Sequence, residues 1–102
     1  MSTLRLRLFI TGQTPRTKRA LTNLHHICSE GLDEKYELEV IDVLEHPQLA
    51  EDEKILATPT LIRELPLPVR RVIGDLSDRK QVLLGLDLQT DVEDATSSRE
   101  SL

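Results

Sequence analysis

The segment Ala57-Thr58-Pro59-Thr60-Leu61 decides how this sequence is interpreted. A proline followed by a threonine and an apolar residue is a step that enters a strand, because proline is tolerated at the first residue of a strand but not at its centre. We therefore predict a strand over residues 60–64. The meaning of this step depends on the elements that precede it.

Upstream, the hydrophobic pattern predicts a strand followed by a helix. Apolar residues alternate from Leu4 to Ile10, which is the period of a strand with one buried face. Thr14 is a candidate N-cap and Pro15 suits the first helical position, so we expect a helix that ends at Gly31. Its buried stripe would comprise Ala20, Leu21, Leu24, Ile27 and Cys28.

A second strand is expected over residues 36–43, where apolar residues again alternate with glutamates. A helix-length connection joins it to the first strand, which favours a parallel βαβ arrangement. A short helix should follow from Pro47. We place the carboxylates Glu51, Asp52 and Glu53 near the start of this helix, where negative charge suits the helix dipole.

The C-terminal half has divided local preferences. The LPLP run at residues 65–68 is incompatible with a central strand or a helix interior, whereas residues 69–73 favour a strand. Ser77 is a candidate N-cap for a helix that carries Val82, Leu83 and Leu86, yet residues 82–88 are apolar enough to form a strand. A segment of this kind can adopt two packings that differ by a few kcal/mol.

Length and composition indicate one domain in the cytoplasm. The 102 residues carry a net charge of −5, and only Phe9 and Tyr36 are aromatic, which argues against a nucleic-acid binder. A single cysteine excludes an intramolecular disulfide and fits a reducing compartment, and neither a signal peptide nor a membrane-spanning stretch is evident. We expect one domain over residues 1–90 and a disordered polar tail over residues 91–102.

Basic residues are concentrated near the N-terminus. Residues 1–29 contain five basic and no acidic residues, whereas residues 30–64 contain eleven acidic and three basic ones. Complementary patches of this kind steer protein–protein encounters. We predict a basic docking edge for an acidic partner surface, formed by Arg16, Lys18, Arg19, Arg70 and Arg71. Solubility is the alternative explanation for these charges.

The loop between the first predicted strand and helix, residues 11–15, contains no cysteine. Thioredoxin-like proteins carry a cysteine pair in this loop, beside a cis-proline, so the chain resembles a thioredoxin relative without redox chemistry. Cys28 lies on the apolar stripe, about four turns away, and is expected to be structural. Because no second cluster completes a site around His25, His26 and Cys28, and no phosphate loop occurs, we expect no metal, no cofactor and no enzyme activity.

Longer segments resemble the KaiB family of circadian clock proteins. They are IDVLEHPQLAEDEKILATPTL at residues 41–61, LPLPVRRVIGDLSDR at residues 65–79 and KQVLLGLDL at residues 80–88, and FITGQTPRTKRAL at residues 9–21 matches in position and character. The resemblance covers roughly residues 4–88.

This resemblance implies an α/β, thioredoxin-like protein of the KaiB type that is not an enzyme. KaiB proteins bind KaiC, a hexameric ATPase, and the complex then captures KaiA; they also compete with a sensor kinase. They rest as homotetramers whose C-terminal half is folded differently, and they bind KaiC as thioredoxin-like monomers. The N-terminal βαβ unit would be shared by the two forms, and the resting form here would be a tetramer or dimer.

Pro59, Gly85 and Asp87 are our candidate fold-switch residues. Pro59 would be a cis-proline in the thioredoxin-like form or a helix-breaking trans-proline in the resting form. Gly85 would permit backbone angles that only the resting form needs and would be simply a poor helix residue otherwise, so Gly85→Ala should favour the KaiC-binding form. Two other functions stay open: a static thioredoxin-like adaptor and, least favoured, a residual thiol enzyme that uses Cys28.

Overall fold

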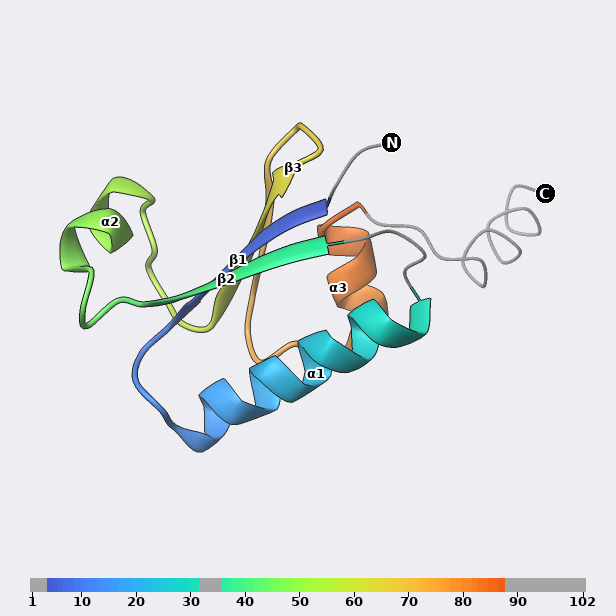
Figure 1. Cartoon of the computed structure of the whole chain (residues 1–102), viewed down its shortest axis with the longest axis horizontal. Coiled ribbons are helices and arrows are strands. Elements are labelled where there is room, and N and C mark those ends of the chain that lie inside the picture. The colour runs from blue at the N-terminus through green and yellow to red at the C-terminus, as the bar shows by residue number, and fades with distance from the viewer. Residues whose placement is uncertain (1–3, 32–35, 88–102) are drawn as a thin grey trace.

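The computed structural model describes residues 4–31 and 36–87 and places four strands and three helices in them. The elements are β1 (Leu4–Ile10), α1 (Pro15–Gly31), β2 (Tyr36–Asp42), α2 (Pro47–Asp52), β3 (Thr60–Leu65), β4 (Arg70–Ile73) and α3 (Arg79–Gly85). The strands form one sheet in the order β2-β1-β3-β4 (Figure 1). The tail predicted over residues 91–102, and the predicted domain end at residue 90, lie outside the described residues.

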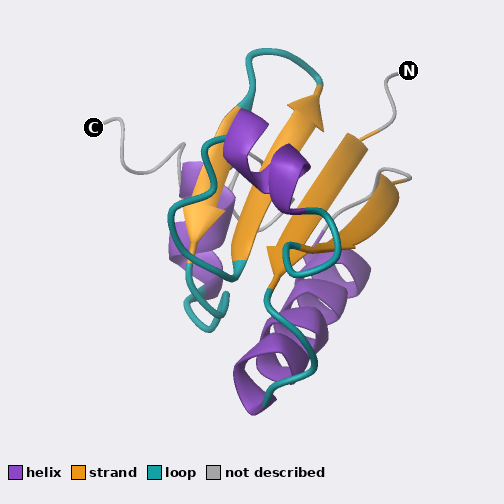
Figure 2. Ribbon diagram, turned by 90° about the vertical axis from the view of Figure 1, so that its left-hand side faces the viewer, coloured by secondary structure: helices purple, strands orange, loops and turns teal. Residues whose placement is uncertain are grey.

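The sheet is mixed. β1 pairs in parallel with β2 and antiparallel with β3, and β4 is antiparallel to β3. The predicted βαβ unit is therefore confirmed, because α1 connects β1 to its parallel neighbour. α2 lies on one face of the sheet, whereas α1 and α3 lie on the other (Figure 2).

Two apolar clusters join the helices to the sheet. The larger cluster contains alternate residues of β1, from Leu4 to Ile10, together with buried residues of α1 and with Val82 and Leu83 of α3. The smaller cluster consists of Phe9, Ile41 and Ile62, against which residues of the α2 region pack. Since successive strand side chains point to opposite faces, the period-two pattern of β1 supplies both clusters.

The structure resolves the helix-or-strand choice in the C-terminal half. Residues 79–85 form a helix, because Val82 and Leu83 then both reach the core. The predicted cap at Ser77 is wrong: Asp78 is the N-cap, and its side chain accepts a hydrogen bond from Gln81 N at 3.1 Å. Serine and aspartate are about equally favoured as N-caps, so the sequence alone does not distinguish the two neighbouring candidates.

α1 begins at the expected cap, whereas the acidic residues expected at the start of α2 lie at its end. Thr14 caps α1 as predicted, since its Oγ1 accepts a hydrogen bond from Thr17 N at 3.1 Å. The prediction of an acidic start for α2 is wrong. Glu51 and Asp52 are its last residues and Glu53 is its C-cap, because the helix extends only from Pro47 to Asp52.

Candidate docking site

The loop that follows β1 meets the strand entry at the Thr58–Pro59 bond. Thr11 Oγ1 and Thr58 Oγ1 lie 2.6 Å apart and share a hydrogen bond, and Pro59 is buried. The Thr58–Pro59 peptide is cis, so of the two alternatives for Pro59 this structure contains the cis form. Two loops far apart in the sequence are thus joined through hydroxyl groups at one end of the sheet.

Asp42, at the end of β2, holds the same loop from the other side. Its Oδ1 accepts hydrogen bonds from Gly12 N at 3.2 Å and from Leu44 N at 2.9 Å. Gly12 has a φ of +64°, a conformation that side-chain-bearing residues rarely adopt. A carboxylate and a glycine therefore give this loop a defined shape.

The chemistry of this end of the molecule does not include a thiol within the described residues. Cys28 is buried near the other end of α1, and burial raises the pKa of its thiol from 9.0 to about 11. A thiol with such a pKa is almost entirely protonated at neutral pH and is a poor nucleophile. This favours the structural role predicted for Cys28 over the thiol-enzyme alternative.

Two exposed leucines flank the joined loops. Leu44 is 67% exposed, and its Cδ1 lies 3.8 Å from the position that a Cβ atom on Gly12 would occupy. Leu56 is 92% exposed and precedes Thr58 by two residues. Both apolar side chains are exposed to solvent beside the joined loops, where a partner protein can contact them. Sequence reasoning missed both leucines, because each has an apolar neighbour, Val43 or Ile55, and nothing in the sequence separates the exposed residue from the packed one.

The three basic residues predicted on the first helix lie next to this end. Arg16, Lys18 and Arg19 are exposed on the first turns of α1, directly after the loop at residues 11–14. Arg19 Nε forms an ion pair with Asp75 Oδ2 at 3.5 Å, which contributes to lowering the pKa of Asp75 after the larger effect of hydrogen bonding to Ser77. The side chains of Arg16 and Lys18 form no hydrogen bond or ion pair within residues 4–31 and 36–87, so they are available to a partner.

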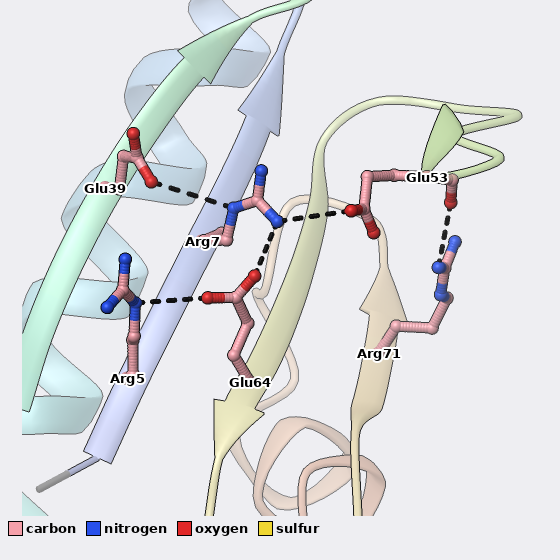
Figure 3. A network of polar contacts seen from close by, with 6 residues as sticks. All are labelled: Arg5, Arg7, Glu39, Glu53, Glu64 and Arg71. Carbon is pink, nitrogen blue, oxygen red and sulfur yellow. Dashed lines mark hydrogen bonds and ion pairs between the residues drawn. The ribbon is translucent and has the colours of Figure 1, made fainter. Parts of the chain in front are cut away.

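Arg70 and Arg71 do not present a common surface. They are neighbours on β4, so their side chains leave opposite faces of the sheet. Arg71 lies on the α2 face, where it donates a hydrogen bond to Glu53 O at 3.0 Å (Figure 3). It also donates to Lys54 O at 3.2 Å. Of the five predicted docking cations, the structure groups the three on α1 and separates the two on β4.

A network of charged side chains lies on the sheet and joins neighbouring strands (Figure 3). Arg7 is its centre: the guanidinium Nη1 donates to Glu64 and to Glu53 Oε2, the latter at 3.4 Å, while Nε lies 3.7 Å from Glu39 Oε1. Glu64 also forms an ion pair with Arg5 Nε at 3.1 Å. The network therefore links β1, β2, β3 and the end of α2.

Burial alone would lower the pKa of Arg7, but Glu64 and Glu53 stabilise its charged form, and the net effect is a raised pKa. The guanidinium also lies over the ring of Phe9, 5.2 Å from its centroid. Sequence reasoning missed this network. The sequence shows only that each of the two strands carries alternating charges of one sign. The register that sets Arg5 opposite Glu37 and Arg7 opposite Glu39 comes from the structure.

Two of the fold-switch candidates, Gly85 and Asp87, lie at the end of α3. A Cβ atom on Gly85 would lie 2.5 Å from Val72 Cγ2, closer than side chains approach. The expectation that Gly85 is simply a poor helix residue in this form is therefore wrong: glycine lets α3 pack closely on β4. Asp87 follows with a φ of +58° and is exposed. Whether Pro59, Gly85 and Asp87 govern a change of fold stays a prediction.

Neither a metal site nor a membrane span is found in the described part of the chain. No three His, Cys, Asp or Glu residues in it are grouped to hold an ion. No helix within residues 4–31 and 36–87 has the length and apolar character needed to cross a bilayer.

Comparisons with known proteins give a consistent result. A family model described as the KaiB domain matches residues 7–88. The chain is 53% identical over 88 residues to the circadian clock protein KaiB3 of Synechocystis sp., with 86% of each chain covered. It is 60% identical over 83 residues to the circadian clock oscillator protein KaiB of Synechococcus elongatus, with 81% of each covered.

Solved structures establish the fold as thioredoxin-like. The N-terminal domain of Synechococcus elongatus SasA superposes with a TM-score of 0.71 at 26% identity, over 85% of this chain and 86% of that one. The thioredoxin Deadhead of Drosophila melanogaster gives a TM-score of 0.64 at 17% identity, over 80% and 77% of the two chains. The predicted α/β, thioredoxin-like fold class is confirmed.

Proposed function

This chain belongs to the KaiB family, and from that premise we propose that it is a non-enzymatic regulatory protein of the cytoplasm that binds a KaiC-type hexameric ATPase. Binding would modulate the phosphorylation and ATPase cycle of the hexamer. The thioredoxin-like conformer would be the binding form. A slow change of fold, with a resting dimer or tetramer, would limit how much of it is present, as the family resemblance implies.

The observation that carries this proposal is the identity of 53–60% to clock proteins named KaiB over more than four fifths of the chain. The geometry of the site is consistent with it. The loop in which thioredoxins carry reactive thiols contains Thr11 here, and its hydroxyl is joined to that of Thr58, the residue before the cis-proline. That arrangement supports a shaped contact surface and offers no nucleophile with a lowered pKa.

We propose that the docking surface consists of the two exposed leucines, Leu44 and Leu56, and the adjacent basic turn of α1. Specific interfaces combine a desolvated centre with a polar, solvent-accessible rim, and this surface offers apolar and charged groups side by side along the chain. The basic turn would face an acidic patch on the ATPase, because its cations Arg16 and Lys18 have no carboxylate partner among the described residues. Arg70 and Arg71, on β4, would add positive charge to the docking surface. Arg71 would do so only if its hydrogen bonds to the carbonyls of residues 53 and 54 break.

Two further partners follow from the same proposal. KaiA would be captured by the assembled complex in organisms that contain it. A sensor kinase would compete for the ATPase, and the TM-score of 0.71 to the SasA N-terminal domain supports competition between proteins of one shape.

Size-exclusion chromatography with light scattering tests the proposal. The protein would be analysed alone and with a KaiC-type hexamer and ATP, with samples taken over hours. We expect a resting oligomer whose subunits slowly move into the hexamer peak. A species that never joins the hexamer, at any dilution or time, would exclude the proposal and favour the static adaptor, for which the single thioredoxin-like fold shared with SasA is the supporting observation.

A further inference from the structure

Arg63 is the most deeply buried charged side chain among the described residues. It lies on β3 and is only 3% exposed. In the sheet it stands opposite Leu6 of β1 and Arg70 of β4, so no acidic residue faces it across either strand pair. A buried charge without a counter-ion is expensive unless its donors find other acceptors.

The acceptors of Arg63 are two backbone carbonyls. Its Nη2 donates to Pro68 O at 2.8 Å, and its Nη1 donates to Asp87 O at 3.2 Å. The third donor, Nε, is buried and has no hydrogen-bond partner. Arg63 forms no ion pair within residues 4–31 and 36–87, so these two carbonyls are its main compensation.

These carbonyls belong to two segments that are separated along the chain by β4, the turn that follows it and α3. Pro68 lies in the loop between β3 and β4, whereas Asp87 follows the last turn of α3. α3 has seven residues, too few for an isolated helix to persist, so tertiary contacts must hold it. A cation at the C-terminal end of a helix is also favoured by the exposed carbonyls there.

We propose that Arg63 is a latch: its forked guanidinium holds the β3–β4 loop and the C-terminal end of α3 together, so that the two segments stay closed or open as a unit. Gly85 complements the latch because its missing side chain lets α3 lie against Val72. If the proposed function holds, the latch sets the population of the conformer that can dock, since apparent affinity scales with that population.

Residue-resolved hydrogen exchange of the full chain tests the latch without any partner. The informative amides are those of Leu86 and Asp87, which bond to Val82 O at 2.9 Å and Leu84 O at 3.1 Å. In Arg63→Met, which keeps the apolar stem and removes the donors, we expect these amides to exchange about tenfold faster while β1 amides are unchanged. Unchanged protection at Leu86 and Asp87 would overturn the proposal.

Arg70→Met is the matched control, because Arg70 lies opposite Arg63 in the sheet but is exposed. An equal acceleration in this variant would show a general effect of charge and would also overturn the latch. If Arg63→Met unfolds, the same exchange measurement is made on Arg63→Lys. Lysine keeps the positive charge but lacks the forked guanidinium that reaches two carbonyls. We expect the same local acceleration, and full protection by lysine would exclude the two-carbonyl latch. None of these outcomes depends on KaiC binding.

Discussion

Gly85 of α3 packs so closely on Val72 of β4 that a Cβ atom at position 85 would lie 2.5 Å from Val72 Cγ2. An alanine at this position therefore has two opposing effects in the thioredoxin-like form. It gains about 0.5–1 kcal/mol of helix propensity relative to glycine, but it must displace a β-branched side chain that has few rotamers.

A double-mutant cycle should separate these effects. We expect Gly85→Ala to be more favourable by about 1 kcal/mol in a Val72→Ala background than in the parent chain, because the smaller residue leaves room for the new methyl group. Urea unfolding of the four variants measures the difference. If Gly85→Ala favours the binding form, it should also raise the rate of capture by a KaiC-type hexamer, and by more in the Val72→Ala background than in the parent chain. Strictly additive changes in the free energy of unfolding would mean that the contact between positions 85 and 72 does not affect stability.

The sequence predicts this fold well where local pattern and tertiary structure agree. Alternation from Leu4 to Ile10, the Thr14 cap and Pro15 all favour the elements that the structure contains. The C-terminal half is ambiguous because an apolar run at residues 82–88 suits a helix or a strand, and the helix is selected by tertiary packing that buries Val82 and Leu83 in the core.

The candidate site was harder to predict from the sequence. The basic turn of α1 was recognisable as a local cluster. The separation of Arg70 from Arg71 depends on strand geometry, and the burial of Arg63 depends on carbonyls that come from residues 68 and 87. The network around Arg7 likewise requires the register of three strands. Such long-range relationships leave little trace in a single sequence.

The two arginines of β1 should differ in their contribution to stability. Arg7 is 11% exposed in its side chain and contacts three carboxylates, whereas Arg5 is 50% exposed and, within the described residues, pairs with Glu64 alone. We expect Arg7→Met to lower the free energy of unfolding by about 2–3 kcal/mol, because it leaves clustered carboxylates uncompensated. Arg5→Met, the control on the same strand and face, should lower it by at most about 1 kcal/mol. Similar losses in chemical denaturation would argue against Arg7 as the centre of the network.

Cys28 should be inert in the folded protein and should make stability depend on alkaline pH. Its pKa is 9.0 in an unperturbed chain and about 11 when buried, so the folded state retains the proton where the unfolded state loses it. The contribution of the protonated Cys28 thiol to the free energy of unfolding is complete below pH 9 and is lost as the pH rises towards 11.

Cys28→Ser supplies the comparison. The free energy of unfolding of the parent chain should fall more steeply between pH 9 and 11 than that of the serine variant, which has no titrating group at this position. Iodoacetamide at pH 8 should modify Cys28 in urea but not in the native state. Rapid modification of the native protein would show that the thiol is accessible and would reopen the question of a reactive role.

Charge reversal on the basic turn of α1 tests the proposed docking surface most directly. Arg19 pairs with Asp75 and Arg71 holds the carbonyls after α2, so their variants would alter the fold as well as the surface. Arg16→Glu and Lys18→Glu avoid this problem. We expect each to weaken binding to a KaiC-type hexamer about tenfold at low salt and less at high salt, because screening reduces the attraction between exposed charges.

Lys80→Glu, an exposed cation at the start of α3, is the matched control and should bind nearly as well as the parent chain. Leu56→Asp should weaken binding at every salt concentration, because it removes an apolar anchor rather than a charge that solvent ions can screen. Titration of the labelled protein with the hexamer, at two ionic strengths, gives the affinities of the parent chain and of the four variants. Normal binding by Arg16→Glu, Lys18→Glu and Leu56→Asp together would place the docking surface elsewhere on the molecule.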